Sequence, residues 1–174
     1  MEKNFDIPEK INDFNVYDDG DRLIGLSDEV SLPEINELTS EMSGPGLLGP
    51  VESPTLGKFE SMEMEIPFVT LYHSAFKLMR TFTSTKLTLR GAVQVSDGEG
   101  NVAMKGMRVV VRGRKKGFTP GKFKQGEGTG SSVKLSLTYL MIELDGKQRL
   151  EIDKLNSIYR VDGVDMLAAI RALC

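Results

Sequence analysis

Three long segments with a strand-like pattern lie in the C-terminal two thirds of this 174-residue chain, and they limit the possible folds more than any other feature. The segments are 86–96, 101–115 and 133–144, and Asp97-Gly98-Glu99-Gly100 predicts a hairpin turn between the first two. Shorter strands are predicted at 148–152, after an Asp145-Gly146 turn, and at 159–162. The chain is therefore expected to be rich in antiparallel β-structure.

Two segments are predicted to be helical. Residues 70–80 carry an apolar stripe of Leu71, Ala75, Leu78 and Met79, and a short C-terminal helix is expected over 164–173. Together with the strands, these helices predict an α+β, mainly β fold, in which one helix packs on an antiparallel β-sandwich or barrel-like domain.

The first third of the chain is organised by turn-forming residues. Segments 14–17 and 22–26 flank an acidic turn and predict a hairpin, and 30–42 is interrupted by Pro33, which is typical of an edge strand. We interpret 1–174 as a single domain with an N-terminal arm at 1–12. Glycine and proline at 43–57 predict a long loop, whose Leu47, Leu48 and Val51 we expect to be buried against another surface.

Residues 58–66 alternate between apolar and polar side chains, which predicts a strand with two unlike faces. Met62, Met64 and Ile66 would point into the core, and Ser61, Glu63 and Glu65 would point away from it.

Charge is distributed unevenly along the chain. The net charge is −3, but residues 1–66 hold 16 acidic and 4 basic residues, whereas residues 67–174 hold 9 and 18. This asymmetry is compatible with two solvated faces or with head-to-tail association between copies of the chain.

The basic residues gather at 105–124, beside a second Gly-rich loop predicted at 116–130. The candidate interface residues in this patch are Arg112, Arg114, Lys115, Lys116, Lys122 and Lys124. Because Phe118 and Phe123 are interleaved with them, the patch could also bind a nucleic-acid strand. The isoelectric point of about 5.3 favours an interface with the acidic half of another copy.

Catalytic and cofactor motifs are not evident. Cys174 and His73 are the single cysteine and histidine, so a multi-cysteine metal site is excluded. The sequence at 117–123 fails the spacing of a phosphate loop. We expect neither enzymatic activity nor a cofactor, and the apolar runs are too short for membrane insertion.

Several motifs, in order and spacing, resemble the major tail tube protein family of contractile-tailed bacteriophages. They are VVVRGRKK at 109–116, KQGE at 124–127, LDGK at 144–147, EID at 151–153, Asn156 and VDGVD at 161–165. Weaker resemblance lies at 31–33, 44–46 and 61–65. The resemblance covers about residues 10–170 and is weakest at 67–85.

This resemblance implies a tail tube fold and a structural role in a virion tail assembled in the bacterial host cytoplasm. In this family, six copies form a ring, inner strands join into a barrel around a lumen, and the rings stack. The implied partners are the chain itself, the sheath, the tape-measure protein, and the baseplate and tail terminator proteins, and DNA passes through the lumen. Phage-derived bacteriocins share this design. The alternative function is a small nucleic-acid-binding module that uses residues 105–124.

A lumen that passes DNA should be acidic or neutral, because basic surfaces bind phosphates. Ser61, Glu63 and Glu65 are therefore the candidates for lining it. The alternative is that they lie on the outer wall, facing solvent or the sheath.

Overall fold

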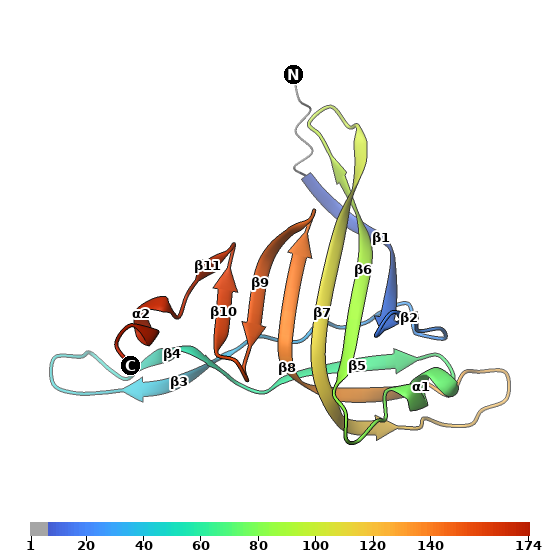
Figure 1. Ribbon diagram of the computed structural model, residues 1–174, viewed down its shortest axis with the longest axis horizontal. Helices are drawn as coiled ribbons and strands as arrows, with labels where there is room; N and C mark the ends of the chain where they lie inside the picture. Colours follow the sequence, from blue (N-terminus) through green and yellow to red (C-terminus); the bar gives the residue numbers. More distant parts are fainter. Residues whose placement is uncertain (1–6) are drawn as a thin grey trace.

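The computed structural model describes residues 7–174, which form mostly antiparallel β-sheet with two short helices (Figure 1). The strands are β1 (Ile7–Asp18), β2 (Asp21–Arg22), β3 (Glu37–Met42), β4 (Val51–Phe59), β5 (Met62–Phe68), β6 (Thr85–Ser96), β7 (Val102–Thr119), β8 (Ser131–Leu144), β9 (Lys147–Asp153), β10 (Ile158–Val161) and β11 (Val164–Asp165). The helices are α1 (His73–Lys77) and α2 (Ala168–Arg171). The main sheet has the order β11-β10-β9-β8-β7-β6-β1-β2, and β5 pairs with β8 outside this path.

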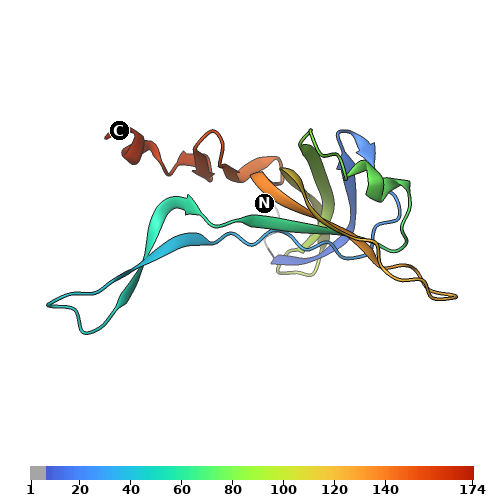
Figure 2. The same ribbon diagram turned by 90° about the horizontal axis from the view of Figure 1, so that it is seen from below.

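The two longest neighbouring strands, β7 and β8, run through both layers of the fold (Figure 2). In the upper part of Figure 1, β7 lies between β6 and β8; beyond Gly113, which is the last residue paired with β6, it continues beside β8 alone. The first half of β8 then pairs with β5 from Met62 to Phe68. One pair of bent strands therefore links the main sheet to a smaller layer of β5, β8 and β7.

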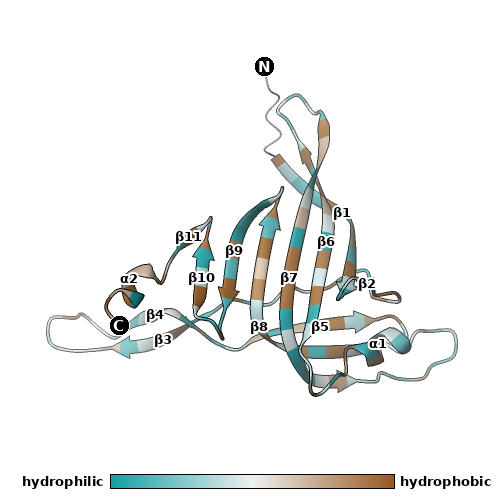
Figure 3. Cartoon of the chain, viewed as in Figure 1, coloured by the Kyte–Doolittle hydropathy of each residue, from teal (hydrophilic) through white to brown (hydrophobic). Residues whose placement is uncertain are grey.

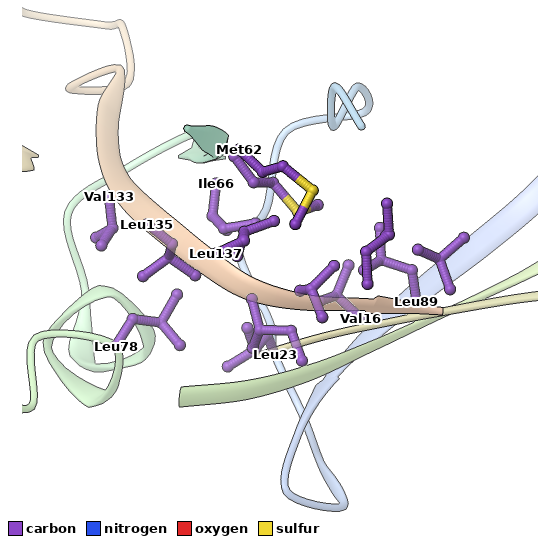
Figure 4. Packing of buried hydrophobic residues seen from close by; sticks show 14 of the residues in the cluster. Val16, Leu23, Met62, Ile66, Leu78, Leu89, Val133, Leu135 and Leu137 are labelled. Carbon is purple, nitrogen blue, oxygen red and sulfur yellow. The ribbon is translucent and has the colours of Figure 1, made fainter. Parts of the chain in front are cut away.

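The hydrophobic core lies between these layers, and Figure 4 shows part of it. Met62, Met64 and Ile66 of β5 are at most 2% exposed, which confirms the alternation predicted for this strand. They pack in one cluster with apolar residues of β1, β6, β7 and β8 and with Ala75 and Leu78 near α1. Figure 3 shows the corresponding alternation of hydrophobic and hydrophilic residues along the strands of the main sheet.

Both predicted helices are shorter than expected. The helix predicted at 70–80 is limited to His73–Lys77, and its N-cap residue Tyr72 makes no side-chain cap. Just before it, the backbone N–H of Leu71 donates to Thr129 Oγ1, so tertiary contacts hold this segment in a non-helical conformation. The helix predicted at 164–173 is wrong in its first residues, because Val164–Asp165 pairs with β10 and only Ala168–Arg171 is helical.

The N-terminal arm predicted at 1–12 is wrong for residues 7–12, which belong to β1 and pair with β6; residues 1–6 lie outside the described part of the chain. The hairpin predicted around the acidic turn is confirmed by β1 and β2. Its turn places Asp19 and Gly20 at positive φ, as hairpin turns of two residues require.

The loop predicted at 43–57 is also corrected, because residues from Val51 onward form β4, which pairs with β3 in a separate two-stranded sheet. Pro54 is tolerated because each strand of such a ribbon has an unpaired edge. The edge strand predicted at 30–42 is limited to Glu37–Met42. The second loop is shorter than predicted at 116–130, because β7 extends to Thr119 and β8 begins at Ser131.

Candidate assembly surfaces

The β3–β4 hairpin projects away from the body of the molecule in both views (Figures 1 and 2). Leu47 in its turn and Val51 at the start of β4 are exposed, and the side chain of Leu48 is fully exposed. In a single copy of the chain, the three apolar residues that the sequence predicts to be buried are therefore exposed to solvent. Their burial against another subunit stays a prediction.

The base of this hairpin is held by the C-terminal strands. Phe59 packs edge-on against Tyr159 of β10, with 4.9 Å between the ring centroids, and Lys154 Nζ donates to the carbonyl oxygen of Glu60. Gly57 adopts a φ of 71°, and a Cβ at this position would lie 2.2 Å from Leu167 Cδ2. The hairpin thus has a fixed base and an exposed tip.

A basic groove of 680 Å³ lies where β7 leaves the main sheet. Arg112, Arg114, Lys115 and Lys116 line it, together with Asp153 as the acidic residue. The Arg112 guanidinium stacks 4.0 Å from the Tyr139 ring centroid and lies 3.6 Å from Asp153, so it is fixed in position.

Asp153 stays ionised beside this groove. Burial opposes its ionisation, but hydrogen bonds donated by the side chain and backbone of Asn156 and by the backbone of Leu155 outweigh burial and hold the pKa of Asp153 below its ordinary value. Asp153 therefore neutralises Arg112 and leaves the other cations of the groove available.

The remaining predicted interface cations differ in their partners. Lys116 pairs with Glu63, and Lys124 pairs with Glu127 within its own loop. Among the described residues, Arg114, Lys115 and Lys122 form no ion pair. The structure thus separates the basic patch into cations that stabilise the subunit and cations that remain unpaired.

Glu63 and Glu65 point away from the core, as predicted, and Ser61 precedes the strand as an exposed residue. Their surface is not purely acidic, because Glu65 lies opposite Lys134 on β8 and Glu63 pairs with Lys116. The hydrogen bond from Lys116 lowers the pKa of Glu63. Whether these residues line a lumen stays a prediction.

The outer face of the main sheet carries a second set of charges that the sequence reasoning missed. Arg108 pairs with Glu143 at 2.6 Å across β7 and β8, and Arg160 pairs with Glu151 at 3.1 Å across β10 and β9. The alternation of charged and apolar residues in these strands was the available signal.

The main sheet ends in two incompletely paired strands. Within residues 7–174, the segment 7–16 of β1 bonds to β6 on one side only, and at the opposite end β11 bonds to β10 alone. Such edges offer backbone N–H and C=O groups to a further strand.

The part of the chain that the structure describes holds neither a metal-ligand cluster nor a membrane-spanning helix. No group of three or more metal-ligating side chains is found there, and His73 is an exposed residue beside Tyr72. No helix of residues 7–174 is long and apolar enough to cross a membrane.

The chain is similar in sequence to two tail tube proteins of phages. The tail tube protein of Escherichia phage P2 is 30% identical over 164 residues, covering 92% of this chain and 94% of that protein. The major tail tube protein of Serratia phage KSP20 is 31% identical over 160 residues, covering 92% and 91%.

The fold is similar to a solved structure of an extracellular contractile injection system, described as the PVC sheath/tube terminator in the extended state. The TM-score is 0.56 at 12% identity, covering 80% of this chain and 99% of that one. The family model for phage tail tube protein FII matches residues 8–173. The chain therefore belongs to the phage tail tube protein family.

Proposed function

We propose that this tail tube protein forms hexameric rings that stack into the inner tube of a contractile tail, through which DNA is ejected. The observation that supports this proposal most strongly is the incomplete pairing of the main sheet, at β1 on one side and at β11 on the other. Joining such edges around a ring produces a closed barrel and removes the edges that would otherwise aggregate.

The proposed partners follow from this role. Further copies extend the tube, the sheath surrounds it, the tape-measure protein occupies the lumen, and baseplate and terminator proteins meet its ends. The similar injection-system chain, described as a sheath/tube terminator, supports sheath and terminator contacts. The proposed location is the virion tail, after assembly in the host cytoplasm. The relatives are structural proteins, which supports a non-enzymatic role.

Electron microscopy of the purified full-length protein over a range of concentrations tests this function. We expect rings and tubes to form without added partners, because the edges and the exposed hairpin are present in each copy. The alternative is a nucleic-acid-binding module, supported by the basic groove and by Phe123, which is 99% exposed. A protein that remains monomeric and shifts DNA in a salt-sensitive way would contradict the tube and favour the alternative.

If the acidic face of β5 lines the lumen, reversing its charge should change how the tube interacts with DNA. We propose that Ser61, Glu63 and Glu65 face the lumen, so the double variant E63K/E65K should still form tubes but should retain DNA. The reason is that each introduced lysine can displace phosphate counterions. Co-sedimentation of tubes with short duplex DNA at low and high salt measures the retention.

The neutral variant E63Q/E65Q is the matched control, since it also removes the Glu63–Lys116 pair but adds no cation. It should retain less DNA than E63K/E65K. Tubes of E63K/E65K that release DNA as freely as the unmodified tubes would contradict the lumen assignment and place these side chains on the outer wall.

A further inference from the structure

An apolar groove of 740 Å³ lies beside β1, at one end of the main sheet. It is lined by residues 11–16 of β1, by the segment 22–32, and by Leu89 of β6 and Val109 of β7. Because Leu89 and Val109 belong to the hydrophobic core cluster, the groove opens on the face of the sheet that holds the core. Ile24 in the lining is 73% exposed, so this apolar surface is open to solvent in a single subunit.

The groove has room at Gly91 of β6, which carries no side chain. In the strand register Gly91 lies opposite Phe14 of β1 and Met107 of β7, and all three line the groove. An added Cβ would make ordinary van der Waals contacts, at 3.6 Å from Ile11 Cγ2 and 3.8 Å from Phe14 Cβ. A side chain at this position would therefore fit the fold but would occupy the groove.

The C-terminal segment, residues 166–173, is a second apolar surface that is exposed in one subunit. Every residue of α2 is exposed, and Met166, Ile170 and Leu173 are 43%, 41% and 90% exposed. The N–H of Leu173 donates to the carbonyl oxygen of Ile170, so these two residues are one helical turn apart and lie on the same face. The segment thus presents an apolar face to a neighbour.

Contacts within the subunit fix the position of this segment. Arg171 pairs with Asp165, and Leu167 lies against β4, where a Cβ added to Gly57 would be 2.2 Å from Leu167 Cδ2. Phe59 of the same strand packs against the hydrophobic core. The C-terminal segment therefore lies on the core side of the main sheet, which is also the side on which the groove opens.

The groove and the C-terminal segment are at opposite ends of the sheet. The strand order places β1 and β2 at one end and β11 at the other, and α2 follows β11 (Figures 1 and 2). A subunit therefore cannot fill its groove with its own C-terminal segment. When the sheets of two subunits are joined edge to edge, the segment that follows β11 in one subunit is brought to β1 of the next, on the matching face.

We propose that the C-terminal segment of one subunit packs in the apolar groove of the next subunit in the ring, with Ile170 and Leu173 over Gly91. This inference rests on the proposed tube function and names one contact within it. Each copy carries both surfaces and they are unlike, so the contact is head-to-tail and is repeated around a ring. Arg171 is the only charged residue of the segment, and Asp28 and Glu29 border the groove, so like charges do not meet.

Filling the groove and removing the apolar face of the segment test the contact from both sides. The variants Gly91→Val and I170S/L173S should each raise the concentration needed for tube formation about tenfold or more, because each removes apolar burial between subunits. Light scattering and electron microscopy measure tube formation. Circular dichroism and urea unfolding check that each subunit is folded.

Matched controls change the same residue types elsewhere. Gly106→Val introduces the same side chain on β7, outside the groove, where an added Cβ would meet no atom of residues 7–174 within 4 Å. V102S/M104S replaces two apolar side chains that are 54% and 55% exposed and lie outside the groove and the segment. Both controls should assemble like the unmodified chain.

Cross-linking identifies the surface that receives the segment. Cys174 is exposed, directly follows the segment and is the single cysteine of the chain. In tubes of the Ile24→Cys variant, a short bismaleimide should link Cys174 of one subunit to the introduced thiol of the next, giving a ladder of linked subunits that ends at the hexamer on a denaturing gel. The ladder should be absent from the double variant I24C/C174S and from Val102→Cys, whose thiol lies outside the groove.

Each outcome has a separate meaning. If the unmodified chain forms no tubes, the proposed function fails. If it forms tubes and either Gly91→Val or I170S/L173S assembles normally, the contact in the groove is overturned and the tube function stands. Tubes of Ile24→Cys that give no ladder, or a ladder equally strong from Val102→Cys, likewise overturn the contact. Weakened assembly of both variants together with a ladder specific to Ile24→Cys supports it.

Discussion

Deleting residues 45–54 is expected to leave a folded subunit that no longer forms tubes. The deletion removes Leu47, Leu48 and Val51, which are 46%, 112% and 47% exposed in one subunit. Burying each in a neighbouring subunit could contribute about 1.5–3 kcal/mol. Because none of them belongs to the hydrophobic core, their loss should affect association and leave folding intact. Sedimentation velocity and electron microscopy measure the assembly.

The control for this deletion keeps the hairpin and changes only its apolar tip. Replacing Leu47 and Leu48 with serine should weaken assembly less than the deletion does, since Val51 and the β3–β4 pairing remain. Circular dichroism should show a folded subunit in all three proteins, with less β-structure in the deletion variant because residues 51–54 pair with β3. Tubes of normal abundance and length from the deletion variant would show that the hairpin tip is not an assembly surface.

Replacing Gly113 with alanine should strongly destabilise the subunit. Gly113 is buried at the register shift where β7 leaves β6, and an added Cβ would lie 2.3 Å from the carbonyl oxygen of Ser136 and 2.9 Å from Leu137 Cδ2. The nearest atom belongs to the backbone of a central strand, so it cannot move without disturbing the sheet. Overpacking of this kind costs about 1–3 kcal/mol and sometimes more. Urea unfolding measures the loss in the free energy of unfolding.

Gly106 is the matched control on the same strand, because a Cβ there would meet no atom within 4 Å. The variant Gly106→Ala should unfold close to the urea midpoint of the unmodified chain. Equal stability of the two alanine variants would contradict the close approach of β7 and β8 at Gly113.

Local sequence patterns were sufficient to predict most of the sheet. The tight turn at 97–100 joins β6 to β7 within one residue of the predicted ends, and the alternation at 62–66 identified the buried face of β5. Both signals act over a few residues. Turn residues define where a strand ends, and a period of two defines which side chains face the core.

Two segments were mispredicted because non-local contacts override local preference. The stripe of Leu71, Ala75 and Leu78 matches a helix period, but Thr129, 58 residues away, holds the backbone of Leu71 outside the helix. Similarly, the glycine and proline residues at 43–57 favoured a loop, whereas pairing with β3 makes a strand from Val51 onward.

The surfaces were only partly predictable for a related reason. The sequence identified the basic patch and the acidic strand face, but the Lys116–Glu63 pair joins residues 53 positions apart. The unpaired cations Arg114 and Lys115 could be recognised only once Lys116 and Arg112 had been matched to their acidic partners. Cross-strand register supplies this information, and local sequence patterns do not contain it.

Cryo-electron microscopy of tubes assembled from the full-length chain is the most direct test of ring formation through joined sheet edges. The account predicts stacked six-fold rings around an open lumen, with the unpaired edge of β1 in each copy beside the C-terminal edge of the main sheet in the next. A filament without a lumen, or rings in which these edges stay apart, would contradict it.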